Sequence, residues 1–151
     1  MKNSLPYENA TSGKRAIHEI QRVLEAFGAT SFGTLENFDK GEVIVQFEWR
    51  GHRVSIPASG KGYAANWLRH HPHTDRMRMT KHEYERRAVG LGKIAVWSIL
   101  RDWIKGQVTA IQCGMMSFEG AFLGSIMLPD GQTVLERITQ DKMLTLPPPS
   151  H

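Results

Sequence analysis

The residues of this sequence best suited to chemistry are the cations of its middle third. Residues 50–101 contain eleven Lys and Arg against three Asp and Glu, a net charge of +8, whereas residues 1–49 and 102–151 each carry −2. Five of the seven histidines lie in the same basic stretch. A basic zone between mildly acidic ends is typical of proteins that bind an anionic partner such as nucleic acid. The alternative interpretation is a solvated surface without a partner.

Two groups of side chains in this zone have the chemistry of a nucleic-acid site, in which cations contact phosphates and aromatic rings stack on bases. The first group, with Trp67 as its stacking candidate, is Arg50, Arg53, Lys61, Arg69, Arg76, Arg78 and Lys81. The second recurs every four residues and forms one ridge if its segment is helical: Lys93, Trp97, Arg101 and Lys105. For Trp97 the alternative is a core side chain whose cationic neighbours reach outward.

A nucleotide-hydrolysing loop is excluded by spacing. The run Ser59-Gly60-Lys61-Gly62 resembles part of a phosphate-binding loop, but that motif needs a glycine five residues before the Gly-Lys pair and a Ser or Thr after it. Those positions hold Ser55 and Gly62. Lys61 between glycines is still suited to contact a backbone phosphate.

Histidines and carboxylates offer weaker alternatives. A metal could be held by His70, His71, His73 and His82, but no second cysteine and no His-x-x-x-His spacing accompanies them, so we expect a basic loop, no metal and no cofactor. A metal-dependent nuclease could use Asp39, Glu42 and Glu48. Arg50 stands where such enzymes place a lysine, and arginine cannot act as a base. We therefore predict a protein that is not an enzyme, and assign Cys113 no role.

The elements that must position these residues can be read from periodicity. Ser12 caps a helix over 13–27 that Gly28 ends, because its apolar residues recur at helical spacing. Alternating residues over 43–49 and 52–56 predict a hairpin with an Arg50-Gly51 turn, in which Pro57 ends the second strand. A weaker strand is expected at 32–38.

Downstream, residues 57–80 read as a mobile basic loop with a short helix near 63–70. The strongest helix covers 93–113 and has a possible start at Lys81, with a break or close contact at Gly90 and Gly92. A short helical turn after Ser117 and a final helix at 132–139 follow. The expected fold is α+β, a small antiparallel meander of two or three strands packed on the long C-terminal helix with an N-terminal helix.

Composition predicts one globular domain. The chain has 151 residues, 40% hydrophobic and 23% charged, with a single cysteine and no apolar stretch of membrane-spanning length. We expect a flexible tail at 1–12, one domain at 13–140 and a Pro-rich tail at 141–151. The lone thiol and the absence of a secretory leader favour the cytoplasm.

The C-terminal half resembles a family of small uncharacterised phage and prophage proteins. The similar segments are Ile104–Val108, Gly114–Leu123 and Leu128–Val134, together with a helix, Gly-Ala and hairpin block at Phe27–Ala29 and Val45–Pro57. The resemblance implies a phage origin, hence the host cytoplasm, and brings no activity. It does not extend to residues 58–80. A looser similarity, at the level of the fold, links the chain to phage single-strand annealing proteins.

The sequence therefore predicts a non-enzymatic nucleic-acid-binding protein of phage DNA metabolism, acting in single-strand binding or as a recombination accessory. We expect DNA rather than RNA, no membrane, and possible homo-oligomers. An alternative is a phage protein that binds and inhibits a host protein complex, such as an anti-defence factor, because a basic patch also docks on acidic protein surfaces.

Overall fold

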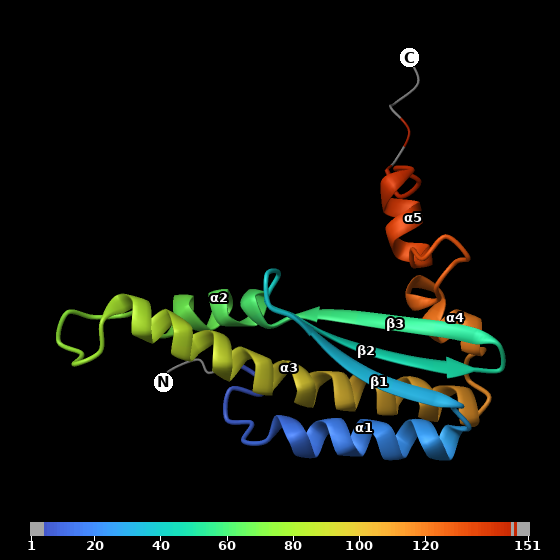
Figure 1. Cartoon of the computed structure of the whole chain (residues 1–151), viewed down its shortest axis with the longest axis horizontal. Coiled ribbons are helices and arrows are strands. Elements are labelled where there is room, and N and C mark those ends of the chain that lie inside the picture. The colour runs from blue at the N-terminus through green and yellow to red at the C-terminus, as the bar shows by residue number, and fades with distance from the viewer. Residues whose placement is uncertain (1–4, 146, 148–151) are drawn as a thin grey trace.

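The computed structural model describes residues 5–145 and 147, and its architecture is the predicted α+β fold. In chain order the elements are α1 (Gly13–Phe27), β1 (Ser31–Asn37), β2 (Glu42–Trp49), β3 (His52–Ser59), α2 (Gly60–His70), α3 (Lys81–Gln112), α4 (Phe118–Phe122), the 3-10 turn η1 (Leu123–Ser125) and α5 (Val134–Gln140). The strands form one antiparallel sheet in the order β1-β2-β3. Helix α3 runs along the body, with α1 beside it and the sheet over it (Figure 1).

Helix α1 forms as predicted. The Ser12 hydroxyl accepts a hydrogen bond from the Arg15 amide at 3.1 Å, and Gly28 ends the helix in the left-handed conformation, with φ of 105°. The fully buried face of α1 is Ala16, Ile20 and Leu24, which recur every four residues. This stripe packs against the buried stripe of α3, so the two helices share one core with the sheet.

The hairpin also follows the prediction. Val43, Val45 and Phe47 are buried on the inner face of β2, and the turn residues Arg50 and Gly51 have φ of 45° and 83°. Two positive φ values in succession match the twist of a two-residue hairpin. Beyond the turn the prediction fails, because Pro57 does not end β3. This strand continues to Ser59, and β3 is an edge strand, where proline is tolerated.

Residues 57–80 are mostly ordered secondary structure, which corrects the predicted mobile loop. Ser59 ends β3 and also caps α2, since its hydroxyl accepts from the Gly62 amide at 2.8 Å. The Gly-Lys-Gly run is thus the first turn of a helix. Only residues 71–80 form a loop, which lies at one end of the body in Figure 1.

Helix α3 is longer than its apolar stripe suggests. It begins at Lys81 and passes unbroken through Gly90 and Gly92, where α2 lies against it. A Cβ atom on Gly92 would lie 2.5 Å from the Gly60 carbonyl oxygen, so only glycine lets the two backbones approach this closely. Gly90 faces open space.

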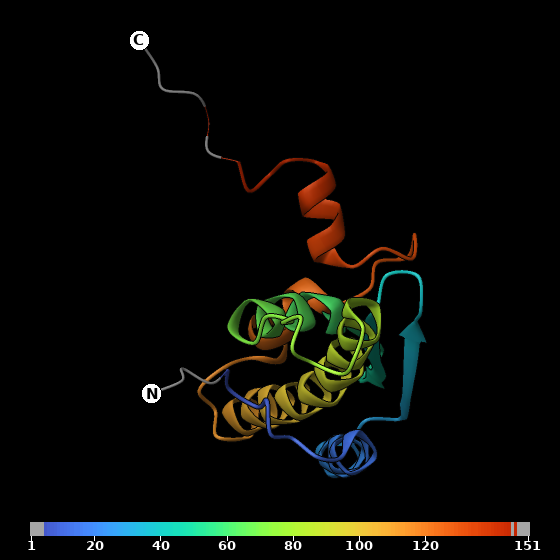
Figure 2. The same cartoon turned by 90° about the vertical axis from the view of Figure 1, so that its left-hand side faces the viewer.

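The two ends of the chain differ from each other. Residues 5–12, predicted as part of a flexible tail, form a strap along the body, and Tyr7 and Tyr63 anchor it through hydrogen bonds of 2.6 Å. At the other end, α5 has no buried residue and projects from the body (Figures 1 and 2). Of the predicted tail at 141–151, residues 141–145 form turns after α5, and 146 and 148–151 lie outside the described residues. Within residues 5–145 and 147, no helix has the length and apolarity needed to cross a bilayer.

A glycine pair tests the contact between α2 and α3. We expect Gly92→Ala to destabilise the fold by about 1–3 kcal/mol through overpacking, whereas Gly90→Ala should stabilise it by up to about 1 kcal/mol as helix propensity rises. Urea denaturation of both variants measures this. Equal effects at the two positions would contradict the close approach.

Candidate nucleic-acid interface

The predicted ridge on α3 is not a row of free cations, and its aromatic member cannot stack on a base. Trp97 is only 4% exposed and belongs to the core, where its indole lies against Gly13. Lys93 pairs with Glu36 at 3.2 Å, and Arg101 pairs with Asp102 at 2.9 Å. Of the four predicted residues, Lys105 alone is exposed and has no ion pair to a described residue.

The hairpin cations lie far from the rest of the predicted site. Arg53 donates to Glu48 at 2.7 Å, and the Arg50 guanidinium lies 4.5 Å from the centroid of the Trp49 ring. In Figure 1 the β2–β3 turn is at the opposite end of the body from the loop at 71–80. The fold therefore divides the basic zone between the two ends of the body, and its cations do not form one continuous surface.

Lys61 and Trp67 are used within the fold. The Lys61 ammonium donates to the Asp39 carbonyl at 3.0 Å, which ties the β1–β2 turn to α2. The half-buried Trp67 ring packs on His71 and Tyr84, with centroid distances of 4.7 and 5.5 Å. Trp67 thus closes the end of α2 onto α3 and is not an open stacking platform, which corrects its predicted role.

A cluster of available cations lies at the end of the body where α2 leads into α3. All six side chains are exposed, and none forms an ion pair with any residue of 5–145. We call this cluster the basic end; it comprises Arg69, Arg76, Arg78, Lys81, Arg86 and Arg87. Three acidic residues in the same segment, Asp75, Glu83 and Glu85, leave a net charge of +3 over residues 69–87.

The basic end contains four predicted residues and two that were not selected from the sequence. The sequence counts Arg86 and Arg87 in the positive charge of residues 50–101 without placing them in a site. Because α3 begins at Lys81, these two arginines lie in its first two turns, beside the other cations of the basic end. The histidines here make other contacts. His73 lies 2.7 Å from the Met79 carbonyl, and His71 lies 2.9 Å from a Glu8 carboxylate oxygen. Among the described residues, no three side chains of metal-binding type come together.

The carboxylates considered for a nuclease do not converge either. Glu42 and Glu48 lie on the same outer face of β2, but six residues of strand separate them by about 20 Å. Glu48 is already paired with Arg53. The strand geometry thus prevents these residues from holding one cation.

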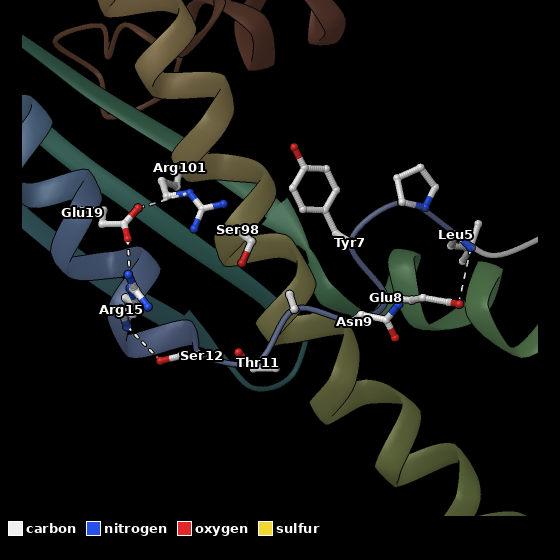
Figure 3. A pocket seen from close by; sticks show the side chains of 12 residues that line it. Leu5, Tyr7, Glu8, Asn9, Thr11, Ser12, Arg15, Glu19, Ser98 and Arg101 are labelled. Carbon is white, nitrogen blue, oxygen red and sulfur yellow. Dashed lines mark hydrogen bonds and ion pairs between the residues drawn. The ribbon is translucent and has the colours of Figure 1, made fainter.

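A cleft beside the strap was missed from the sequence. It has a volume of about 620 Å³ and lies between the strap, α1 and α3 (Figure 3). Apart from the strap it is lined by Arg15, Glu19, Ser98 and Arg101. These residues come from distant segments with no shared motif, so only the packing of the strap could reveal them.

Tyr7 holds the strap over this cleft. Its hydroxyl donates to Asp102 at 2.6 Å, and its backbone is held at φ of 68°, a conformation that costs side-chain-bearing residues about 1–3 kcal/mol. The bond to the Asp102 carboxylate raises the pKa of Tyr7. Hydrogen bonds from Arg101 and then Tyr7 lower the pKa of Asp102 below its usual range.

Protein-family models, curated proteins and solved structures contain no match to this chain. The resemblance to phage proteins therefore stays a prediction. Any functional conclusion rests on the geometry of the basic end and the cleft.

The Tyr7 hydroxyl can be tested by removing it. In Tyr7→Phe the strap loses one hydrogen bond, and we expect amide exchange in residues 8–12 to accelerate about 2- to 10-fold, as for a net bond of about 1 kcal/mol. Hydrogen-exchange mass spectrometry measures this. Exchange in α1 and α3 serves as the internal control, and an unchanged strap would contradict the anchoring role.

The same pair sets a pH window for the strap. Because the pKa of Asp102 is lowered, its contribution is present above pH of about 3.9 and is lost as pH falls through the lowered value. Because the pKa of Tyr7 is raised, its contribution is present below pH of about 10 and is lost as pH rises through the raised value. The protection factor of the strap amides, which corrects for the pH dependence of intrinsic exchange, should therefore fall at both extremes of pH, and Tyr7→Phe should remove the fall at alkaline pH.

Proposed function

We propose that this chain binds nucleic acid through the basic end, without catalysing a reaction. The observation that supports this is the contrast in pairing among its cations. Arg53, Lys93 and Arg101 each have a carboxylate partner, whereas the six cations of the basic end have none within residues 5–145. Unpaired cations gathered on one projecting end can displace counterions from a phosphate backbone, which drives nonspecific association.

The proposed contacts are to the backbone rather than to bases. Trp67 and Tyr84, the aromatic rings nearest the basic end, pack on each other and on neighbouring histidines. Phosphate contacts carry no sequence information, so the binding would be weakly selective. Because Trp67 packs within the fold and offers no open surface for stacking, nothing favours single strands over duplexes as ligands. A place in phage DNA metabolism is the context that the family resemblance implies.

The salt dependence of DNA binding and the removal of two positive charges test the proposal. If about four of the six cations engage, the log–log salt slope for duplex DNA should be near −3.6. The exposed loop variant Arg76→Gln/Arg78→Gln should bind more weakly and reduce the slope by about 1.8. Fluorescence anisotropy from low salt upward measures both quantities.

The matched control removes the same charge at the opposite end, in Arg50→Gln/Arg53→Gln, and should retain the wild-type affinity and slope. Equal losses in the two double variants, or no binding to DNA or RNA at low salt, would remove the basic end as the site.

A second candidate function, binding to a host protein, is favoured by apolar exposure at the other end of the chain. Met115, Leu135, Met143 and Leu144 are 75%, 54%, 68% and 71% exposed, and α5 buries no residue. Such side chains are typical of protein interfaces. A partner that survives nuclease treatment, is lost on Leu135→Glu/Leu144→Glu and is kept by Arg76→Gln/Arg78→Gln would favour this function over the first.

A further inference from the structure

The strap cleft contains hydrogen-bond donors that the fold leaves unused. Arg101 donates from Nε to Asp102 at 2.9 Å, and its Nε lies 3.5 Å from a Glu19 carboxylate oxygen. Its two terminal nitrogens have no hydrogen-bond partner among the described residues. In Figure 3 they lie on the side of Ser98 and Tyr7, facing the cleft. We call these two terminal nitrogens the Arg101 fork. A guanidinium that is held at Nε and has this fork free can donate to two neighbouring acceptors.

Ser98 points to the same space. This residue is only 5% exposed, and its hydroxyl makes no hydrogen bond to a described residue. Figure 3 shows the hydroxyl directed toward the strap, away from the axis of α3. Among the described residues no side-chain polar atom is both fully buried and unpaired, so the Ser98 oxygen is reachable from the cleft, where a ligand or water can bind it. Together with the Arg101 fork, it marks a place for a polar ligand.

The charge of the lining decides which class of ligand fits. The cleft is lined by Arg15 and Arg101 and by the carboxylates of Glu8 and Glu19, so its formal charge is zero. Arg15 and Arg101 both pair with Glu19. A free phosphate or carboxylate gains no net attraction from such a lining. A neutral ligand with two adjacent acceptors gains both bonds without desolvating a charge of its own.

The ring of Tyr7 adds an apolar surface. Tyr7 lines the cleft, is 38% exposed, and its hydroxyl is occupied by Asp102, which leaves the ring face for contact. A planar heterocycle stacks on such a ring. A cleft of about 620 Å³ lies within the range of small-molecule sites and accommodates one base with its sugar.

We propose that the strap cleft binds a guanine base, with O6 and N7 on the Arg101 fork and the ring against Tyr7. Guanine presents two neighbouring acceptors on the edge that base pairing leaves free, whereas on that edge adenine presents an acceptor with a donor, cytosine a lone donor, and thymine or uracil a single acceptor. The base can come from a free nucleotide or from a bound strand. None of the residues involved belongs to the basic end, so this site stands independently of the proposed function.

Binding of guanosine and guanosine 5′-monophosphate, measured by calorimetry on the full chain, tests the site. We expect both ligands to bind, with a preference over the adenine, cytosine and uracil nucleotides of about 5- to 100-fold. Ser98→Ala, which removes only the oxygen, should weaken guanosine binding about 3- to 10-fold with an unchanged melting temperature. Arg101→Lys keeps the charge but lacks the fork, and should weaken it at least about 10-fold.

Three results would overturn the proposal: no binding of guanosine, equal binding of adenosine or cytidine, or displacement of guanosine 5′-monophosphate by inorganic phosphate. The variant Arg76→Gln/Arg78→Gln should keep guanosine binding while it loses DNA binding, which separates failure of this site from failure of the basic end. A tighter complex with oligo(dT) carrying one dG, reversed by Ser98→Ala, assigns the base to a bound strand. Guanosine binding without that gain assigns it to a free nucleotide.

Discussion

The close contact of α2 on α3 is the constraint on which the rest of the structure depends. At Gly92 the backbones meet at a distance that leaves no room for a Cβ atom, and Ala64 and Ala88 are buried along the same seam. This contact turns a segment with loop-like composition into a helical hairpin. The hairpin carries the basic residues of 69–87 to one end of the body and gives the strap a surface on which to lie.

Pairing, rather than charge alone, separates the parts of the basic zone. Carboxylates of α1, β1 and β2 reach cations that come later in the chain, as Glu36 reaches Lys93 and Glu48 reaches Arg53. These surface pairs contribute little stability, but they occupy the cations. The parts of the basic zone therefore differ: Glu36 and Glu48 occupy Lys93 and Arg53, whereas Glu8, which reaches the loop at 71–80, pairs with His71 and with none of the six cations of the basic end.

The strap shows how a segment without regular structure can build a site. Residues 5–12 have no periodicity, and their Asn, Ser and Thr content is that of a tail. Two tyrosine hydroxyls and one carboxylate nevertheless hold them across α2 and α3. The cleft beneath them contains the Arg101 guanidinium, which Asp102 holds at Nε, and the Ser98 hydroxyl. Both groups line the open cleft, where a ligand can reach them.

The helix over 13–27, the three strands, the hairpin turn and the final helix could be predicted from the sequence, because caps, periodicity and turn residues act over a few neighbours. Which cations are free, whether Trp97 is buried, and the existence of the cleft could not. Those properties depend on residues as distant as Glu36 and Lys93, or Tyr7 and Asp102. Only the packing of the helices and the strap brings such pairs within hydrogen-bond distance, and patterns among neighbouring residues do not predict these contacts.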